Sequence, residues 1–256
     1  SWFSTTHYND EAQRRLEEYA AIAAEAEALY EKMPAERKDA FFQLVLYPVC
    51  CASLMNQKVI CADKSMQYAA EGRASTVDYA DRANAAAREI VALTERYNRG
   101  MTTVGAKWNH MISWAPGPWG HQRHQFEMPP VSRFDGLGPP ELDVALESHD
   151  GGRLPELSVY TQGRRFIDLF NRGKGTVRWR AVGVPGWVQL SQTEGEFEKE
   201  QRVWVSADWG AAPSGEEGQG SFRLVAGNVS KTIDVPVFNP QDALPKDFSG
   251  FVESHG

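Results

Sequence analysis

The chain has 256 residues, more than a typical single domain, and a formal net charge of −7 from 27 basic and 34 acidic residues. Because no Lys/Arg block offsets this acidic balance, we expect neither a nucleic acid nor an anionic membrane as partner. No apolar run approaches the roughly 20 residues that span a bilayer, and the first residues do not have the pattern of a signal peptide, so we expect neither feature in this sequence. Since the chain opens on SWFSTTHYND without a methionine, we expect a piece of a longer or processed polypeptide.

The first part of the chain has the apolar spacing of helices. After Asn9 or Asp10, either of which can cap a helix, apolar residues recur from Leu16 to Met33 on one face. Residues 41–60 are apolar nearly all round, which predicts a central helix covered on several sides.

Two further features belong to this helical part. Pro48 is expected to kink or split the central helix, because it lacks the N–H of a helical hydrogen bond. Ser75 and Asp78 resemble a capping box at the start of another helix, which carries apolar residues from Ala83 to Tyr97. The patterns predict an antiparallel helical bundle.

Cys50, Cys51 and Cys61 all fall in the central helix, where their spacing does not suit a disulfide. We interpret them as buried, inert thiols; the alternatives are a metal site or a reactive thiol.

Residues 105–130 form a hinge between the helical and the β part. This segment is too polar for a core and too aromatic for a passive linker, so we expect a ligand-facing surface there, suited to stacking on sugar rings. Interdomain packing is the alternative. The candidate substrate-binding residues are Trp108, Asn109, His110, Trp114 and Trp119. His110, His121 and His124 have no evident carboxylate second shell, so we predict no metal site.

After residues 136–140 the apolar period changes from 3.6 to 2, and about seven short strands follow. This pattern predicts an immunoglobulin-like β-sandwich, with the strand of Pro236 at a sheet edge. Trp179, Trp187 and Trp204 are core residues or sugar platforms. Asn228 begins an N-glycosylation sequon and is a candidate glycosylation site.

The fold class is therefore multidomain, α then β. Residues 1–135 form the helical bundle with its hinge, residues 136–240 form the β-sandwich, and residues 241–256 form a linker. The chain has no phosphate loop, dinucleotide fingerprint, Gly-x-Ser-x-Gly, HExxH or CxxC motif, so we predict no cofactor and nominate no catalytic residue.

Three stretches of this sequence carry a resemblance to a known family: AFFQLVLYPV, GAKWNHMI, and the region from RRFIDLFNRGKGTVRWRA through QRVWVSADWGAAP. They resemble the middle and C-terminal portion of glycoside hydrolase family 115, and the likeness extends from HYNDEAQRR to FSGFVESHG. Within the hinge it covers Lys107 to Met111, after which the sequence departs from the usual continuation.

The resemblance implies a xylan α-1,2-glucuronidase that removes glucuronic acid or its 4-O-methyl ether from xylan. It also implies that the catalytic barrel precedes this chain and carries the acid and base, and that the linker of residues 241–256 leads to a further C-terminal β domain. We then expect the barrel, a xylan-type glycan and a second copy of the chain as partners, in a secreted or periplasmic protein. A stand-alone carbohydrate-binding module and a structural spacer or dimerisation unit are the alternatives.

Overall fold

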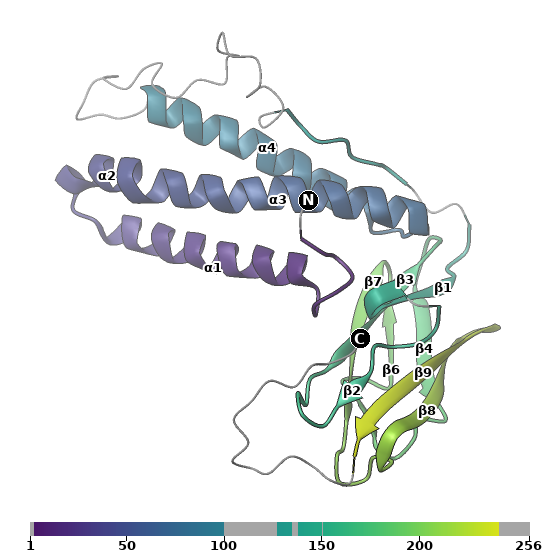
Figure 1. Ribbon diagram of the computed structural model, residues 1–256. Coiled ribbons are helices and arrows are strands. Elements are labelled where there is room, and N and C mark those ends of the chain that lie inside the picture. Colours follow the sequence, from purple (N-terminus) through teal and green to yellow (C-terminus); the bar gives the residue numbers. More distant parts are fainter. Residues whose placement is uncertain (1–2, 100–126, 135–137, 150, 241–256) are drawn as a thin grey trace, which may run out of the picture. The chain divides into compact units, whose positions relative to one another are not determined.

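The computed structural model describes residues 3–99, 127–134, 138–149 and 151–240. It has a helical region followed by a β-sandwich, as the sequence predicts (Figure 1). The chain divides into two compact units, each of which is built from several stretches of sequence. The helical unit comprises Ser1–Thr5, Glu11–Glu71 and Thr76–Arg133, and the β unit comprises Thr6–Asp10, Gly72–Ser75 and Phe134–Gly256.

The helical unit contains α1 (Glu11–Lys32), α2 (Ala35–Phe41), α3 (Tyr47–Glu71) and α4 (Thr76–Arg99). The three long helices run antiparallel, with α3 between α1 and α4 (Figure 1). The small residues Ala80, Ala83 and Ala86 of α4 are buried, which lets a neighbouring helix approach it closely. Because α3 contacts only α1 on one side and α4 on the other among these long helices, its two remaining faces are not covered by them.

A π-helical turn, Phe42–Leu46, joins α2 to α3 without a break. In this turn the Tyr47 N–H donates to the Phe42 carbonyl five residues back, rather than four. Pro48 follows directly and lacks an N–H, so a local change of hydrogen-bond register precedes it while the helix continues. The expected split at Pro48 is therefore wrong.

The start of α1 also differs from the prediction. Asn9 and Asp10 have φ of 58° and 51°, far from the extended backbone of a usual helix cap. The Asn9 Oδ1 atom has no hydrogen-bond partner among the described residues, and the Asp10 carboxylate binds an arginine of the β unit. The Asn9 side-chain oxygen therefore does not serve as the predicted cap, and for Asp10 that role stays a prediction.

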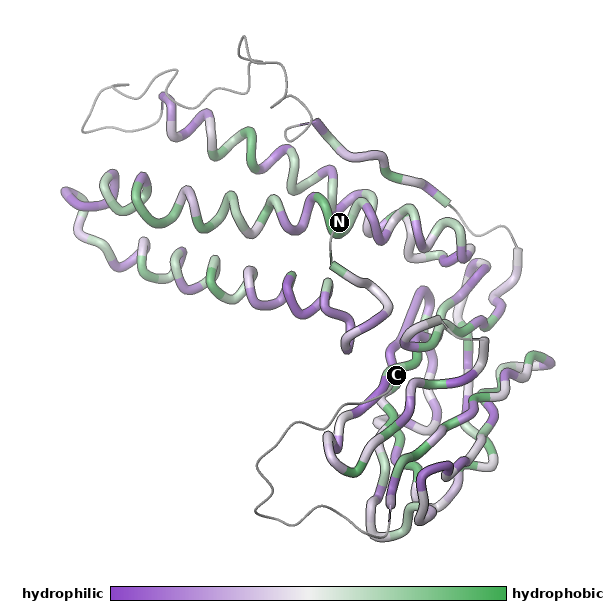
Figure 2. Tube along the Cα trace, in the orientation of Figure 1, coloured by the Kyte–Doolittle hydropathy of each residue, from purple (hydrophilic) through white to green (hydrophobic). Residues whose placement is uncertain are grey.

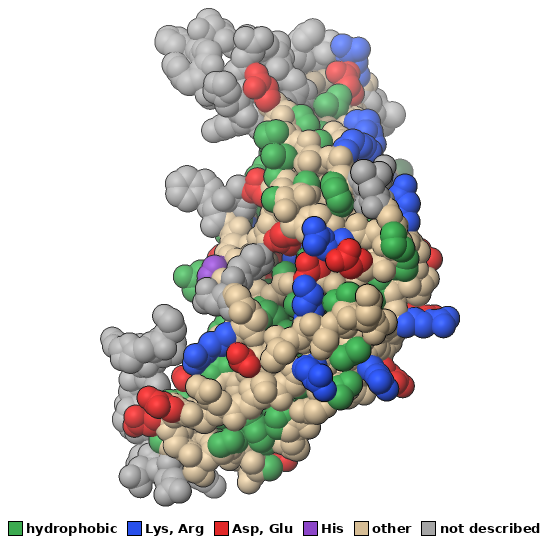
Figure 3. Space-filling view, turned by 90° about the vertical axis from the view of Figure 1, so that its right-hand side faces the viewer, with side chains coloured by type: hydrophobic (Ala, Val, Ile, Leu, Met, Phe, Trp, Pro, Cys, Tyr) green, Lys and Arg blue, Asp and Glu red, His purple; other side chains and the backbone are tan. Residues whose placement is uncertain are grey.

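The helical unit leaves more apolar surface uncovered than predicted. Figure 2 shows hydrophobic colour along much of the stretch from α2 into α3, and Figure 3 shows hydrophobic side chains among charged ones on one face. The exposed large apolar side chains include Ile22, Leu29, Leu44, Val45, Met66 and Val91. The expectation of a helix covered on several sides is therefore only partly met.

By length and composition, the continuous helix Ala35–Glu71 could cross a membrane, the one such helix among the described residues. This finding corrects the expectation that no stretch approaches that length. The core helix of a soluble protein passes the same test.

The β unit contains two sheets. The four-stranded sheet has the order β1-β3-β7-β5, and the five-stranded sheet has the order β2-β9-β8-β4-β6. All pairs are antiparallel except β2 with β9. The strands are β1 (Leu142–Leu146), β2 (Leu157–Ser158), β3 (Arg165–Asn171), β4 (Val177–Val182), β5 (Val188–Leu190), β6 (Glu194–Phe197), β7 (Glu200–Ala207), β8 (Gly215–Ala226) and β9 (Val229–Asn239).

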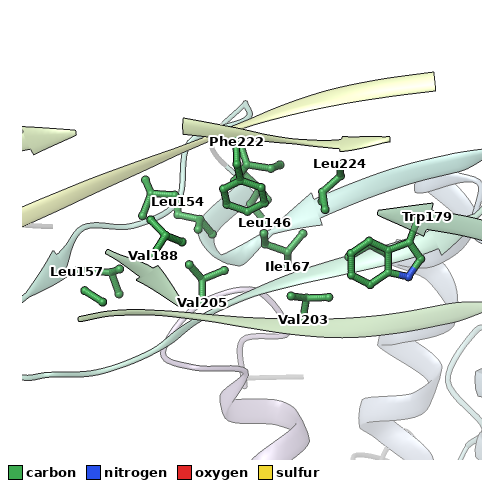
Figure 4. Close-up of a cluster of buried hydrophobic side chains, with 14 of the residues drawn as sticks. Leu146, Leu154, Leu157, Ile167, Trp179, Val188, Val203, Val205, Phe222 and Leu224 are labelled. Atoms are coloured by element: carbon green, nitrogen blue, oxygen red, sulfur yellow. The ribbon is translucent and has the colours of Figure 1, made fainter. Parts of the chain in front are cut away.

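The core of the β unit lies between the two sheets. Figure 4 shows Ile167, Val203 and Val205 of the four-stranded sheet beside Phe222 and Leu224 of the other. The seven predicted strands are present, and the sequence analysis missed β2 and β6. These two are short, and β6 reads EGEF, which has no apolar alternation.

Pro236 does not lie in an edge strand, because β9 pairs with both β8 and β2. The Asp234 N–H donates toward Gly152, on the β2 side, so the Pro236 nitrogen two residues later faces the same side. Strand β2 pairs there only from Leu157 onward. The missing donor of Pro236 thus falls where the neighbouring strand is interrupted.

Replacing Leu46 with Ala should destabilise the helical unit by about 2 to 5 kcal/mol, because the side chain is 5% exposed and packs among Ala26, Phe42 and Cys50. Leu44→Ala is the matched control: the same truncation at a side chain that is 73% exposed should cost under about 0.5 kcal/mol. Urea unfolding followed by helical circular dichroism measures both. Equal losses would mean that Leu46 does not anchor the helices.

Candidate functional site

Strand β3 is buried on both of its faces. Ile167 and Leu169 point into the core between the sheets, whereas Phe166, Asp168 and Phe170 alternate with them and are also buried. The outer face of the four-stranded sheet therefore carries a second buried layer. A buried carboxylate in that layer requires a charge partner.

The register between β3 and β7 supplies this partner. Residues directly opposite each other on these antiparallel strands lie on the same face of the sheet, close enough for their side chains to interact. The outer-face pairs are Phe166 with Trp204, Asp168 with Arg202, and Phe170 with Glu200. An aromatic pair thus neighbours an ion pair on the two central strands of the sheet.

Arg202 is the centre of this layer. Its Nε atom lies 2.7 Å from Asp168 Oδ1 and its Nη2 atom lies 3.0 Å from Asp168 Oδ2, a bidentate pair. The same Nη2 lies 2.9 Å from Asp10 Oδ2, and the guanidinium stacks 4.0 Å above the Phe166 ring. One cation therefore binds two carboxylates and an aromatic ring.

Burial by itself lowers the pKa of Arg202. The hydrogen bonds and negative charges of Asp168 and Asp10 outweigh that effect, and the pKa of Arg202 is raised above its ordinary value. The guanidinium is therefore permanently charged and is suited to a fixed structural ion pair rather than to proton transfer.

Arg73 supplies a second cation to the same layer. Its side chain is 1% exposed, and its Nη1 atom lies 3.5 Å from Asp168 Oδ2 and 3.9 Å from Glu200 Oε2. The guanidinium also lies 4.6 Å from the Phe170 ring centroid. The Ser75 hydroxyl donates to Glu200 Oε2 at 2.7 Å, so the predicted capping serine is engaged with a strand residue. We call Asp10, Arg73, Asp168, Glu200 and Arg202 the outer-face network.

Two members of the outer-face network come from short segments of the N-terminal half. Thr6–Asp10 and Gly72–Ser75 belong to the β unit although the neighbouring helices do not. Backbone hydrogen bonds hold them as well: Ser148 N–H donates to the Thr6 carbonyl at 2.7 Å, and Ala74 N–H donates to the Asn171 carbonyl at 2.8 Å. These segments therefore complete the outer face of the four-stranded sheet.

The chemistry of the outer-face network is that of an anchor. Each of its three carboxylates lies within 4 Å of an arginine nitrogen, and those of Asp10 and Asp168 are buried. Breaking such a pair leaves a buried charge without compensation. Among the described residues, no group of three or more His, Cys, Asp or Glu side chains is arranged to hold a metal ion.

The candidate substrate-binding residues of the hinge lie outside the described residues. These are Trp108, Asn109, His110, Trp114 and Trp119, together with His121 and His124, which we considered as metal ligands. Their assignment remains a prediction from the sequence.

The sandwich tryptophans are used for packing. Trp179 and Trp187 are buried in the core; the Trp179 Nε1–H donates to Gln201 Oε1 at 2.8 Å, and Trp187 packs on Gly220. A Cβ at Gly220 would lie 2.6 Å from Trp187 Cζ2, so the ring requires glycine there. Trp204 is half-buried, with the Arg164 guanidinium 3.8 Å from its ring centroid. The buried rings of Trp179 and Trp187 therefore present no open face for a sugar, and Arg164 occupies one face of Trp204.

Asn228 lies in the two-residue turn between β8 and β9 and is exposed. A glycan could therefore be attached there without unfolding a strand, and the assignment stays a prediction.

The three cysteines are free, and Cys50 and Cys61 are buried. Burial raises the pKa of Cys50 and of Cys51 to about 11, and it also raises the pKa of Cys61. Thiols with raised pKa values stay protonated at neutral pH and are poor nucleophiles and metal ligands. These features agree with the interpretation as inert thiols.

The sequence analysis missed the outer-face network. The segment RFIDLFN has apolar residues on both of its alternating faces, a pattern of strands buried on both sides. That signal marks the strand as covered on its outer side, but it does not identify Asp10 and Arg73 as the covering residues.

No family model and no curated protein matches the chain. Among solved structures, a family GH115 4-O-methyl-α-glucuronidase with specificity for decorated arabinogalactans aligns over 77% of this chain and 31% of its own, at 20% identity and a TM-score of 0.37. A Bacteroides ovatus GH5 xyloglucanase aligns over 43% of this chain and 21% of its own, at 20% identity and a TM-score of 0.31. The PapD-like domain of human CEP192 aligns over 44% of this chain and 96% of its own, at 9% identity and a TM-score of 0.31.

The chain spans 31% and 21% of the length of the two glycoside hydrolases. Each of these TM-scores is below 0.5, and a likeness at this level carries no inference about function.

Arg202→Leu should destabilise the β unit by about 3 to 5 kcal/mol, because it leaves Asp168 and Asp10 buried without this cation. Arg178→Leu is the control, since the Arg178–Glu196 pair is largely exposed and should contribute under about 1 kcal/mol. Urea unfolding followed by tryptophan fluorescence compares the two. Similar free energies of unfolding for both variants would show that the outer-face network is not an anchor.

Proposed function

We propose that this chain is the noncatalytic C-terminal region of a family 115 xylan α-1,2-glucuronidase. The full protein would remove glucuronic acid or 4-O-methylglucuronic acid from xylan and would be secreted or periplasmic. In this proposal the catalytic barrel precedes the chain, which supports the barrel, contributes to a homodimer and offers hinge aromatics to the glycan.

One observation carries the proposal. The residues Asp10, Asp168 and Arg202 come from HYNDEAQRR, RRFIDLF and QRVWVS, three stretches that share the family resemblance. They meet in one buried ion network. Stretches of resemblance that are distant in sequence but join in one contact support a common fold more strongly than any one of them alone. The order of helices before sandwich agrees with the family's expected architecture.

A structural spacer or dimerisation unit is the second candidate function. The exposed apolar side chains of the helical unit, such as Ile22, Leu44 and Val91, favour it, because exposed apolar patches mark association surfaces. A stand-alone carbohydrate-binding module receives less support, since the rings of Trp179, Trp187 and Trp204 are occupied by packing. Sedimentation velocity of the chain over a concentration series tests the association.

The chain alone should release no glucuronic acid from glucuronoxylan oligosaccharides, whereas the native polypeptide should be longer and should release it. The measurements are the mass of the native polypeptide and the acidic sugar released, followed by anion-exchange chromatography. Release by the repurified chain alone would contradict the proposal. So would a native polypeptide no longer than this chain.

Trp119→Ala should weaken binding of glucuronoxylan, because a stacked aromatic ring contributes about 0.5 to 1.5 kcal/mol, or roughly two- to tenfold in affinity. Trp204→Ala is the matched control: its ring is covered by Arg164, so its loss should leave affinity unchanged. Affinity electrophoresis in glucuronoxylan gels, on variants shown to be folded by circular dichroism, measures both. An unchanged mobility for Trp119→Ala would remove the hinge from the binding surface.

A further inference from the structure

The segment Thr6–Asp10, which we call the strap, has an unusual backbone. Tyr8, Asn9 and Asp10 have φ of 56°, 58° and 51°, three consecutive non-glycine residues in the left-handed region. Residues with a Cβ adopt this region rarely and then singly, because the Cβ approaches the following carbonyl oxygen. Such a run persists only where surrounding contacts hold it.

Contacts with neighbouring parts of the β unit hold the strap, and three of them are described here. The Asp10 carboxylate binds the Arg202 Nη2 at 2.9 Å, and the Asn9 N–H donates to Glu147 Oε1 at 3.1 Å. At the other end, the Thr6 carbonyl accepts from Ser148 N–H at 2.7 Å. The first of these contacts is the only ion pair among the three.

Closing the strap also has costs, and its one large ring stays outside the core. The Tyr8 side chain is 74% exposed, so it contributes little apolar burial. Asn9 Oδ1 and Glu147 Oε2 are buried, and neither has a hydrogen-bond partner among the described residues. Burying an acceptor without a donor opposes closure, because in the open strap these oxygens would bind water.

We propose that Thr6–Asp10 is a strained strap that opens locally while the four-stranded sheet stays folded. The Asp10–Arg202 ion pair holds the strap closed. Opening relieves the backbone strain of the three left-handed residues and lets water bind the two side-chain oxygens that lack a partner. It does not leave the Arg202 charge uncompensated, since Arg202 keeps both of its bonds to Asp168. This inference concerns a conformational property of the chain and does not depend on the proposed function.

The consequence of opening is local and specific. Asp10 lies against the guanidinium of Arg202, which in turn stacks on Phe166. The Arg202 side chain is 23% exposed while the strap is closed, and opening increases its access to solvent. The strap is thus a conformational device that controls the exposure of one half-buried charge.

Hydrogen exchange of the full chain, followed by mass spectrometry of peptides, tests whether the Asp10–Arg202 ion pair holds the strap closed. In the wild type, amides of the strap should exchange at least about tenfold faster than those of β3, because local opening requires less free energy than global unfolding. Asp10→Asn should accelerate strap exchange by a further factor of about ten and leave β3 and β7 unchanged. Asp143→Asn, which alters an ion pair elsewhere in the β unit, should change nothing in the strap.

A pair of substitutions at Tyr8 tests the strain. Tyr8→Gly should slow strap exchange about fivefold relative to Tyr8→Ala, because both remove the ring but only glycine adopts φ of 56° without strain. In a loop that is merely loose, glycine would leave exchange unchanged or make it faster. That result would overturn the proposal, as would strap and β3 amides that exchange at one common rate. If Asp10→Asn does not fold, the wild type and the Tyr8 pair decide alone.

Discussion

The pairing of Arg202 with two carboxylates is the interaction on which the β unit depends. Once Phe166 and Phe170 make the outer face of β3 a place where water is excluded, a charge on that face has to be compensated. The strand register sets Asp168 opposite Arg202, and Arg202 has donors left for a second acceptor. Asp10 fills that position from the far end of the sequence.

This requirement explains why the β unit is not one continuous stretch of sequence. Its outer layer needs Asp10 and Arg73, so it includes Thr6–Asp10, which precedes α1, and Gly72–Ser75, which lies between α3 and α4. A polypeptide cut near residue 136 would keep all nine strands but lose both segments. The sandwich sequence by itself therefore lacks the residues that cover one of its faces.

The regular elements were predictable because they follow local rules. The 3.6-residue period before the hinge gave α1, α3 and α4, and the two-residue period gave seven strands. The failures occurred where tertiary contacts override a local preference. Pro236 is tolerated in an inner strand because the neighbouring strand is interrupted there. Asn9 has a left-handed backbone in a segment whose contacts with the β unit, such as the bond from Asn9 N–H to Glu147, hold it in place. Neither feature can be predicted from residue type alone.

The outer-face network was less predictable for a similar reason, because its members are distant in sequence. Strand β3 shows from its alternation that something covers it, yet many charged residues of the helical half are equally plausible partners. Only the fold selects Asp10 and Arg73, because it places the segments Thr6–Asp10 and Gly72–Ser75 on the outer face of the four-stranded sheet.

The same fold narrows where a glycan can bind. A sugar platform needs an aromatic ring with one open face, and the sandwich uses Trp179 and Trp187 as core and covers Trp204 with Arg164. An anchor of paired charges likewise offers no spare acid or base for hydrolysis. Of the three sandwich tryptophans, two are therefore core residues and the third already stacks on a cation, which favours packing over sugar binding for all three.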